Sequence, residues 1–214
     1  HAEEITEDSG YFIPHREVIR PDAATTKFRV VMNASAGIRS LNALLSKGEA
    51  KNLAVVDHLV RLRKHQVMVS VDLKKAFLQI LIKPEDRKWI RFLWQEKDEK
   101  ITRYEMKVLP FGVVCSPAIL TQVVENIVKS LKERARKNLT GAAYMDDLLV
   151  GSNSESELIE NLKEAQRGFA EAGFEFHKTF TNRENVAKAL RASTEESMVL
   201  GMIWKKKHDT IQTR

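Results

Sequence analysis

The sequence predicts an α+β fold in which antiparallel sheets are backed by helices. Paired stretches that alternate apolar and polar residues across polar turns are typical of β-hairpins. Longer stretches repeat their apolar residues at helical spacing, as amphipathic helices do. The third observation is the stretch 142–151, where two adjacent carboxylates, Asp146 and Asp147, stand between short apolar runs. That pattern predicts two buried strands with the acids at their turn.

Composition bounds the class of protein. The 214 residues are 43% hydrophobic and 30% charged, which fits a globular chain with a sizeable core. The net charge of +6 is compatible with a polyanionic partner but does not identify one. A single cysteine, Cys115, excludes an internal disulfide framework and a cysteine-based zinc site. Charged residues interrupt every apolar run before it reaches membrane-spanning length, so no membrane partner is expected.

The chain opens with an acidic segment, 1–10, that has no periodic apolar pattern, and we expect a mobile lead-in there. Extended stretches at 11–19 and 27–32 follow on either side of a polar turn at 22–26, which predicts a hairpin. Cations flank its tip, and two interpretations stay open: a hairpin edge kept soluble by charge, or a clamp on phosphates. These cations are Arg20, Lys27 and Arg29.

A helix and a strand are expected next. Asn52 is a suitable N-cap for a helix over 53–65. Its histidines, His58 and His65, lack the partners of a metal site, so we expect them at the surface or partly buried. The β-branched run that ends at Asp72 predicts a strand that delivers a carboxylate to the end of a sheet. Such an acid alone is more often a capping residue than a ligand.

A second hairpin and a long helix are expected in the middle of the chain. Stretches 89–94 and 104–109 alternate around a charged turn, and their aromatic residues are expected to fill a core rather than to stack on bases. Ser116 and Pro117 then provide a cap and a first-turn proline for a helix that runs to Leu131 and ends in a basic segment.

Another helix follows the acidic hairpin. Ser154 and Glu157 have the spacing of a capping box, and Gly173 supplies the stop. The remaining segments are 174–178 and 199–204, expected as strands, and 183–197, which is helix or loop.

Three acids stand out by position: Asp72 at a strand end, and Asp146 with Asp147 at a hairpin turn. If the two elements are neighbours in one antiparallel sheet, their carboxylates converge. Convergent carboxylates can hold two Mg²⁺ ions, which would activate an attacking oxygen and stabilise the leaving oxygens of a phosphoryl transfer. The alternative is a plain hairpin with a solvated Asp-Asp turn.

Five stretches, in a fixed order, together resemble the reverse transcriptase domain of LTR retrotransposons, and within these the BEL/Pao family. They are 71–77, 109–112 with 116–117, 144–147, 173–178 and 200–204. The earlier segments 11–15, 25–31, 34–35 and 40–42 are similar to the BEL/Pao fingers. The resemblance therefore covers nearly everything from Tyr11 to Trp204.

This resemblance implies the fingers and palm of a right-hand polymerase that lacks its thumb. The implied activity is that of an RNA-directed DNA polymerase, a reverse transcriptase, which adds nucleotides from dNTPs to a primer 3′-hydroxyl on an RNA or DNA template. Two Mg²⁺ ions would serve it, with Mn²⁺ as a substitute. The implied parts are the lead-in 1–10, fingers at 11–46 and 82–108, palm at 47–81 and 109–204, and at 205–214 the start of a connection to the missing thumb.

The resemblance also implies roles for individual residues. Asp72 and Asp146 would hold both metals. Asp147 and the backbone carbonyl of Leu73 would assist. Lys178 would lie near the departing pyrophosphate and protonate it. The residues implied to bind the dNTP are Lys27, Arg29, Phe77 and Gly112, and those implied to contact template and primer are Tyr144, Met145, Phe111 and Gly201.

Three residues of this set carry more specific expectations. The Phe77 ring would occupy the space that a ribose 2′-hydroxyl needs and so select deoxynucleotides; the alternative is simple core filling. Gly112, which lacks a Cβ, would let the backbone approach the nucleotide site. Phe111 stands where retroviral enzymes carry Gln, although retrotransposon relatives often carry Phe, so details of fidelity do not transfer.

Three other functions stay open. A host-adopted relative would bind nucleic acid without catalysis; loss of one acid would favour it, and all three are present. An RNA-synthesising polymerase with a similar palm is the second, and Phe77 argues against it. The third is a basic structural protein. The implied partners are an RNA template, a DNA primer and dNTPs, with thumb and RNase H domains in a longer polyprotein. The implied location is intracellular, in a cytoplasmic retroelement particle, with nuclear entry left open.

Overall fold

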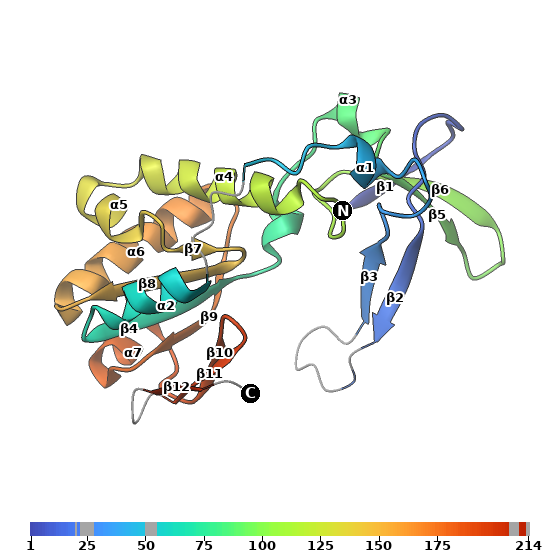
Figure 1. Cartoon of the computed structure of the whole chain (residues 1–214). Coiled ribbons are helices and arrows are strands. Elements are labelled where there is room, and N and C mark those ends of the chain that lie inside the picture. Colours follow the sequence, from blue (N-terminus) through green and yellow to red (C-terminus); the bar gives the residue numbers. More distant parts are fainter. Residues whose placement is uncertain (20, 22–27, 50–54, 206–209, 213–214) are drawn as a thin grey trace. The chain divides into compact units, whose positions relative to one another are not determined.

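The computed structural model describes residues 1–19, 21, 28–49, 55–205 and 210–212 (Figure 1). The chain divides into two compact units. Unit 1 comprises 1–50 and 77–120, and unit 2 comprises 51–76 and 121–214. The division after Leu120 falls inside the helix Ser116–Ser130.

Unit 1 contains a three-stranded antiparallel sheet in the order β1-β6-β5 and a separate hairpin of β2 with β3. Both expected hairpins are confirmed, although the turn at 22–26 and its neighbours Arg20 and Lys27 lie outside the described residues. The strands are β1 (Ala2–Ile5), β2 (His15–Ile19), β3 (Phe28–Met32), β5 (Arg91–Gln95) and β6 (Ile101–Met106). The helices are α1 (Leu41–Leu44), the 3-10 helix η1 (Ala76–Gln79), which begins at the unit boundary, α3 (Pro84–Arg87) and the start of α4 (Ser116–Ser130).

The first ten residues are not the lead-in without structure that was expected. Strand β1 pairs antiparallel with β6, and ion pairs hold both the strand and the residues that follow it. The Glu3 carboxylate lies 2.8 Å from Lys107 Nζ, and the buried Arg91 guanidinium lies 2.8 Å from Glu7 and 3.1 Å from Glu105. The prediction was wrong because it looked for apolar periodicity, whereas this segment is ordered by backbone pairing and by cations distant in sequence.

A compact apolar cluster forms the core of unit 1. It draws on the segment before β2, on β3 and on β6, and so joins the hairpin to the three-stranded sheet. Its buried members are Ile13, Met32, Ala34, Leu41, Ile90, Met106, Val108 and Val113.

Unit 2 is built on a four-stranded antiparallel sheet in the order β7-β8-β4-β9, beside a smaller sheet in the order β10-β11-β12. Its strands are β4 (Val67–Leu73), β7 (Ala143–Tyr144), β8 (Asp147–Ser152), β9 (Phe176–Thr181), β10 (Ser197–Val199), β11 (Met202–Lys205) and β12 (Thr210–Gln212). Its helices are α2 (Val55–Arg63), most of α4, α5 (Glu133–Leu139), α6 (Glu155–Glu171) and α7 (Glu184–Leu190). Among the described residues, no helix has the length and apolar character needed to cross a membrane.

The register of β4 sorts its side chains onto two faces of the sheet, because successive residues of a strand point to opposite sides. Met68 packs on one face with Leu62 of α2 and Trp204 of β11. Val71, which has the opposite parity, lines a small cavity with Leu162 of α6. Helices α2 and α6 therefore cover opposite faces (Figure 1), which explains why six of the seven β4 residues are buried.

Helix ends follow local signals where the structure describes them. The Ser154 hydroxyl accepts a hydrogen bond from the Glu157 amide at 3.3 Å, and Gly173 adopts a φ of +84° just past α6, so both ends of this helix are confirmed. Within the open segment 183–197, α7 is helical. The expected cap Asn52 lies outside the described residues.

Two expectations in unit 2 are corrected. The basic segment after Leu131 does not end α4 but forms the separate helix α5, whose Ala135 and Leu139, four residues apart, are both buried. The single strand expected over 199–204 is the hairpin of β10 with β11. Leu200 and Gly201 form its turn with φ values of 50° and 82°, and two positive φ values in succession are the mark of a type I′ turn.

Candidate functional site

The acidic hairpin is a pair of strands joined by a two-residue turn. Tyr144 of β7 pairs with Asp147 of β8, and Met145 and Asp146 form the turn. Met145 has a φ of 54°, whereas Asp146 is not in the positive region, so the turn resembles type II′, where glycine is usual at the first position. A β-carbon at that φ costs on the order of 1–2 kcal/mol, so the hairpin holds Met145 in a strained conformation.

Asp72 lies directly across from this hairpin. The register pairs Asp72 of β4 with Asp147 of β8, and the Leu73 amide donates a hydrogen bond to the Asp146 carbonyl oxygen at 2.8 Å. Residues that face each other across antiparallel strands present their side chains on the same side of the sheet. The convergence expected of the three acids is therefore present at the backbone level.

The electrostatics of the three acids are coupled. Burial raises the pKa of Asp147 to about 7, with the charges of Asp146 and then Asp72 adding to the effect. The pKa of Asp72 is also raised, first by burial and then by the charge of Asp146. Both shifts arise because negative charges share a partly desolvated strand end, and nearby positive charge would reverse them.

A β-bulge brings two basic residues to the other side of Asp72. Leu73 pairs with Phe176 and Val71 with Thr179, so His177 and Lys178 of β9 together oppose Asp72. Their charges lower the pKa of Asp72 and so act against its burial. The resemblance implied a place for Lys178 near the departing pyrophosphate, and the structure places it opposite Asp72. His177 was missed because only the bulge reveals its position.

The donor set suits a divalent cation that takes oxygen ligands. In the described part of the chain, no group of three or more His, Cys, Asp or Glu side chains is spaced to hold a metal ion. Mg²⁺ does not need three protein ligands, since it commonly takes one or two carboxylates together with waters and substrate phosphates. Asp72 and Asp147, opposite each other with raised pKa values, fit that requirement.

A buried histidine of helix α2 packs against the acidic hairpin. His58 of α2 is 2% exposed, contrary to the expectation of a surface or half-buried position, and its ring meets that of Tyr144 edge to face at 5.5 Å. Burial lowers the pKa of His58, which favours the neutral form of the ring that packs against Tyr144. The helical pattern of α2 alone could not reveal this role, because it does not say what α2 packs against.

The remaining residues implied in nucleotide binding belong to unit 1. The Phe77 and Phe111 rings lie 4.7 Å apart at 54° to each other; Phe77 is 8% exposed and Phe111 45%. Gly112 has a φ of +96°, and a Cβ there would lie 2.0 Å from the Met32 carbonyl oxygen. Close packing inside unit 1 thus accounts for this glycine by itself. Lys27 and the side chain of Arg29 lie outside the described part of the chain.

The structure therefore brings one group of the expected residues together at the end of a single sheet. The group at the end of the unit 2 sheet is Asp72, Leu73, Tyr144, Met145, Asp146, Asp147 and Lys178. Gly201 belongs to the separate β10–β11 hairpin, where a Cβ would meet nothing within 4 Å, so its conformation and not its size requires glycine.

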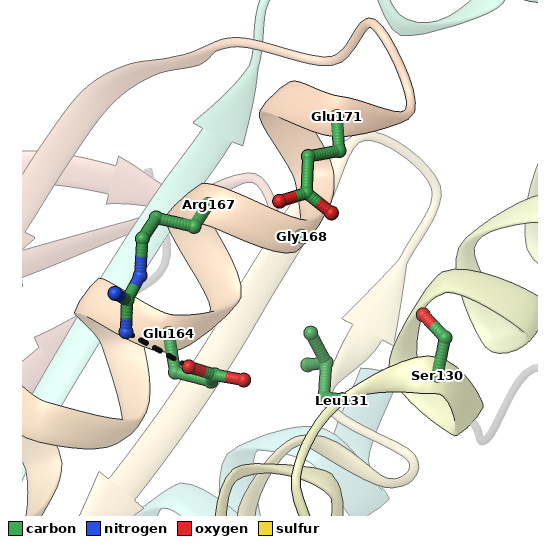
Figure 2. Close-up of a pocket in the computed structure, with 6 residues that line it drawn as sticks. All are labelled: Ser130, Leu131, Glu164, Arg167, Gly168 and Glu171. Carbon is green, nitrogen blue, oxygen red and sulfur yellow. Dashed lines mark hydrogen bonds and ion pairs between the residues drawn. The ribbon is translucent and has the colours of Figure 1, made fainter.

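A cavity of about 220 Å³ lies elsewhere in unit 2, between α6 and the end of α4 (Figure 2). Figure 2 shows the Arg167 guanidinium turned toward Glu164, with which it forms an ion pair at 2.9 Å. None of the candidate residues lines this cavity, so it does not enlarge the site. Its lining residues are Ser130, Leu131, Glu164, Arg167, Gly168 and Glu171.

Comparisons with known proteins agree with this geometry. Residues 17–202 match the family described as reverse transcriptase (RNA-dependent DNA polymerase). The Gag-Pol polyprotein of Rous sarcoma virus subgroup B is 30% identical over 150 residues, which cover 69% of this chain and 9% of that protein. The Pol polyprotein of equine infectious anemia virus (strain Wyoming) is 32% identical over 143 residues, covering 64% of this chain and 12% of that protein.

Solved structures share the fold. The foamy viral protease-reverse transcriptase in complex with an RNA/DNA hybrid matches with a TM-score of 0.70 and 21% identity, over 98% of this chain and 24% of that one. Its dRH form in complex with double-stranded DNA also gives 0.70 and 21%, over 96% of this chain and 31% of that one. This chain spans only about a tenth of the length of the curated relatives that it matches. Since the family match extends over most of its length, the chain belongs to the reverse transcriptase (RNA-dependent DNA polymerase) family.

Proposed function

We propose that the chain catalyses template-directed DNA synthesis, adding a nucleotide from a dNTP to a primer 3′-hydroxyl on an RNA or DNA template. The observation that carries this proposal is the opposition of Asp72 and Asp147 across β4 and β8, beside Asp146. The family supports it. So do the foamy viral structures, which are complexes with double-stranded DNA or an RNA/DNA hybrid. The motifs of the fingers segment and palm favour a BEL/Pao-type retroelement as the source.

The metal site is assigned to Asp72 and Asp146, with Asp147 and the Leu73 carbonyl assisting. Two bound Mg²⁺ ions, or Mn²⁺ in their place, would activate the attacking hydroxyl and stabilise the leaving oxygens. Burial, and then the charges of Asp146 and Asp72, raise the pKa of Asp147. This supports the assignment, because a bound divalent cation would offset the repulsion among the three acids. Pairing of β4 with β8 keeps the carboxylates in fixed positions, which is the main contribution that phosphoryl transfer requires of the protein.

Lys178 is assigned to the departing pyrophosphate, which it would neutralise and protonate. Its place in the β9 bulge, opposite Asp72, supports this role, since the bulge turns an exposed cation toward the acids. His177 shares the bulge and adds a second nearby base.

Residues of unit 1 are assigned to the incoming nucleotide. Phe77 would exclude a ribose 2′-hydroxyl, Lys27 and Arg29 would contact the triphosphate, and Gly112 would line the nucleotide site. The dNTP and rNTP incorporation rates of wild type and Phe77→Ala separate this role from simple core filling by the buried ring. Contacts with the template and primer are assigned to four residues: Phe111, Tyr144, Met145 and Gly201.

In this proposal unit 1 serves as fingers and unit 2 as palm of a right-hand polymerase. A thumb and an RNase H domain belong to a longer polyprotein, as the names of the viral relatives suggest. The proposed location is a cytoplasmic retroelement particle.

Incorporation of labelled dNTPs on a primed RNA template, with Mg²⁺, tests the proposal. Asp146→Asn should lower incorporation by more than about 100-fold, the scale seen when a group that stabilises transition-state charge is removed. Glu195→Gln, an exposed acid of the same unit, is the matched control and should leave the rate unchanged. Equal rates for wild type and Asp146→Asn would refute the proposal. Binding of the template without metal-dependent incorporation would favour a non-catalytic, host-adopted relative.

A further inference from the structure

One asparagine holds the loop that carries Phe111. Asn42, next to the start of α1, uses three of the four hydrogen bonds that its amide can make. Its Nδ2 donates to the Gly112 carbonyl oxygen at 2.9 Å and to Ser35 Oγ at 2.8 Å, and its Oδ1 accepts from the Val114 amide at 2.8 Å. Two of these bonds go to the loop, on either side of Val113, so the amide fixes the loop's position and orientation together.

The loop is also fixed from its other side. A Cβ at Gly112 would lie 2.0 Å from the Met32 carbonyl oxygen, so the backbone here already packs as closely as a glycine allows. The loop is therefore held between Asn42 and Met32, and Phe111, the residue before Gly112, has little freedom to move with its backbone.

Phe111 in turn contacts Phe77. Their ring centroids lie 4.7 Å apart, which is within the range of favourable aromatic pairs. Phe111 is the exposed member at 45%, and Phe77 the buried one at 8%. The Phe77 ring would have to displace Phe111 to swing toward it, and the anchored loop keeps the Phe111 backbone from moving away.

We propose that Asn42 is a specificity-determining positioning residue, which keeps Phe111 against Phe77 so that both rings together limit the room beside the nucleotide sugar. This inference rests on the proposed function, in which Phe77 discriminates between deoxynucleotides and ribonucleotides. It adds that discrimination depends on a pair of rings and on the amide that anchors the second ring. Asn42 itself touches no substrate.

The test compares kcat/KM for a dNTP and the matching rNTP on a primed template. Asn42→Ala should lower the dNTP preference by about 2- to 10-fold, the effect of one or two lost hydrogen bonds on a positioned group. Phe111→Ala should lower it as much or more. Adding Asn42→Ala to Phe111→Ala should change it little further, because the amide acts through the ring.

Two more variants separate positioning from general damage. Asn42→Asp keeps the acceptor for the Val114 amide but cannot donate to Gly112, so it should lower the preference as Asn42→Ala does even where the alanine variant folds poorly. Ser35→Ala removes only the bond that does not reach the loop, and it should leave the preference within about twofold of wild type. A merely structural role would lower the rates for both nucleotides equally and leave their ratio unchanged.

The outcomes are distinct. An unchanged ratio in Asn42→Ala and Asn42→Asp, with wild-type incorporation intact, overturns this inference alone. A shift of the same size in Ser35→Ala overturns it as well, since that bond bypasses the loop. No incorporation by the wild type overturns the proposed function and, with it, this inference.

Discussion

Replacing Asp147 by Asn should stabilise the protein at neutral and alkaline pH when no divalent cation is present. The folded pKa of Asp147 is about 7, against an ordinary value of 3.8. A carboxyl with a raised pKa takes up protons more readily in the folded state. Below about pH 4 both states are protonated and the shift has no effect; as pH rises toward 7 the unfolded state ionises first, and the folded state loses stability.

The size of the effect follows from the same values. A shift from 3.8 to about 7 corresponds to at most about 4 kcal/mol at pH 8, and to about 2 kcal/mol at pH 5. The side chain is partly exposed, so solvent screening should reduce both figures, and we expect a stabilisation of about 1–3 kcal/mol at pH 8. Asn has nearly the same shape as Asp and no charge, so it removes the penalty without leaving a cavity.

Urea unfolding at about pH 5 and about pH 8, in a chelating buffer, measures this difference. The gain in unfolding free energy for Asp147→Asn should be larger at pH 8 than at pH 5, while Glu195→Gln, exposed in the same unit, should show no such trend. Adding Mg²⁺ at pH 8 should stabilise wild type more than Asp147→Asn. Destabilisation by Asp147→Asn at pH 8, or an equal gain at both pH values, would refute the electrostatic reasoning.

Three further predictions concern single positions, each measured by urea unfolding. Gly112→Ala should cost at least about 2 kcal/mol because its Cβ would meet the Met32 carbonyl, whereas Gly201→Ala, with a similar φ and open space, should cost only about 1 kcal/mol; equal costs would count against the close approach. Met145→Gly should be neutral or stabilising by up to about 1 kcal/mol, since it relieves a positive φ, and a clear loss would show that the strain is absent. Phe169→Ala, at a fully buried position, should cost about 3–5 kcal/mol, and a cost below about 1 kcal/mol would contradict its place in the core.

Features with a local signature could be predicted from the sequence. The cap at Ser154 and the stop at Gly173 depend on one turn of chain, and both are present. The alternation of polar and apolar residues likewise placed both hairpins of unit 1. The acidic hairpin was predicted for the same reason, since a turn and its flanking strands lie within ten residues.

Features that depend on pairing between distant segments could not be predicted in this way. Strand β1 has no apolar pattern, and the ion-pair partners of its Glu3, Arg87 and Lys107, lie over 80 residues away, as does Arg91, the partner of Glu7 just after the strand. The bulge opposite Asp72 depends on the register between β4 and β9, to which no single stretch of sequence points. The same holds for Asn42, since nothing about an asparagine in the first turn of a short helix indicates that it anchors a loop 70 residues later.

The register of β4 links the candidate site to the core of unit 2. Because side chains alternate along a strand, a slip of one residue would move Asp72 to the face covered by α6 and Val71 to the face of the acidic hairpin. The bond from the Leu73 amide to the Asp146 carbonyl and the packing of Met68 against Trp204 both oppose such a slip, one at each end of the strand. The position of the carboxylates therefore depends on the apolar packing of Met68, four residues before Asp72 in the same strand. A change at Met68 that leaves the sheet intact but loosens its register should disturb the acids before it unfolds the protein.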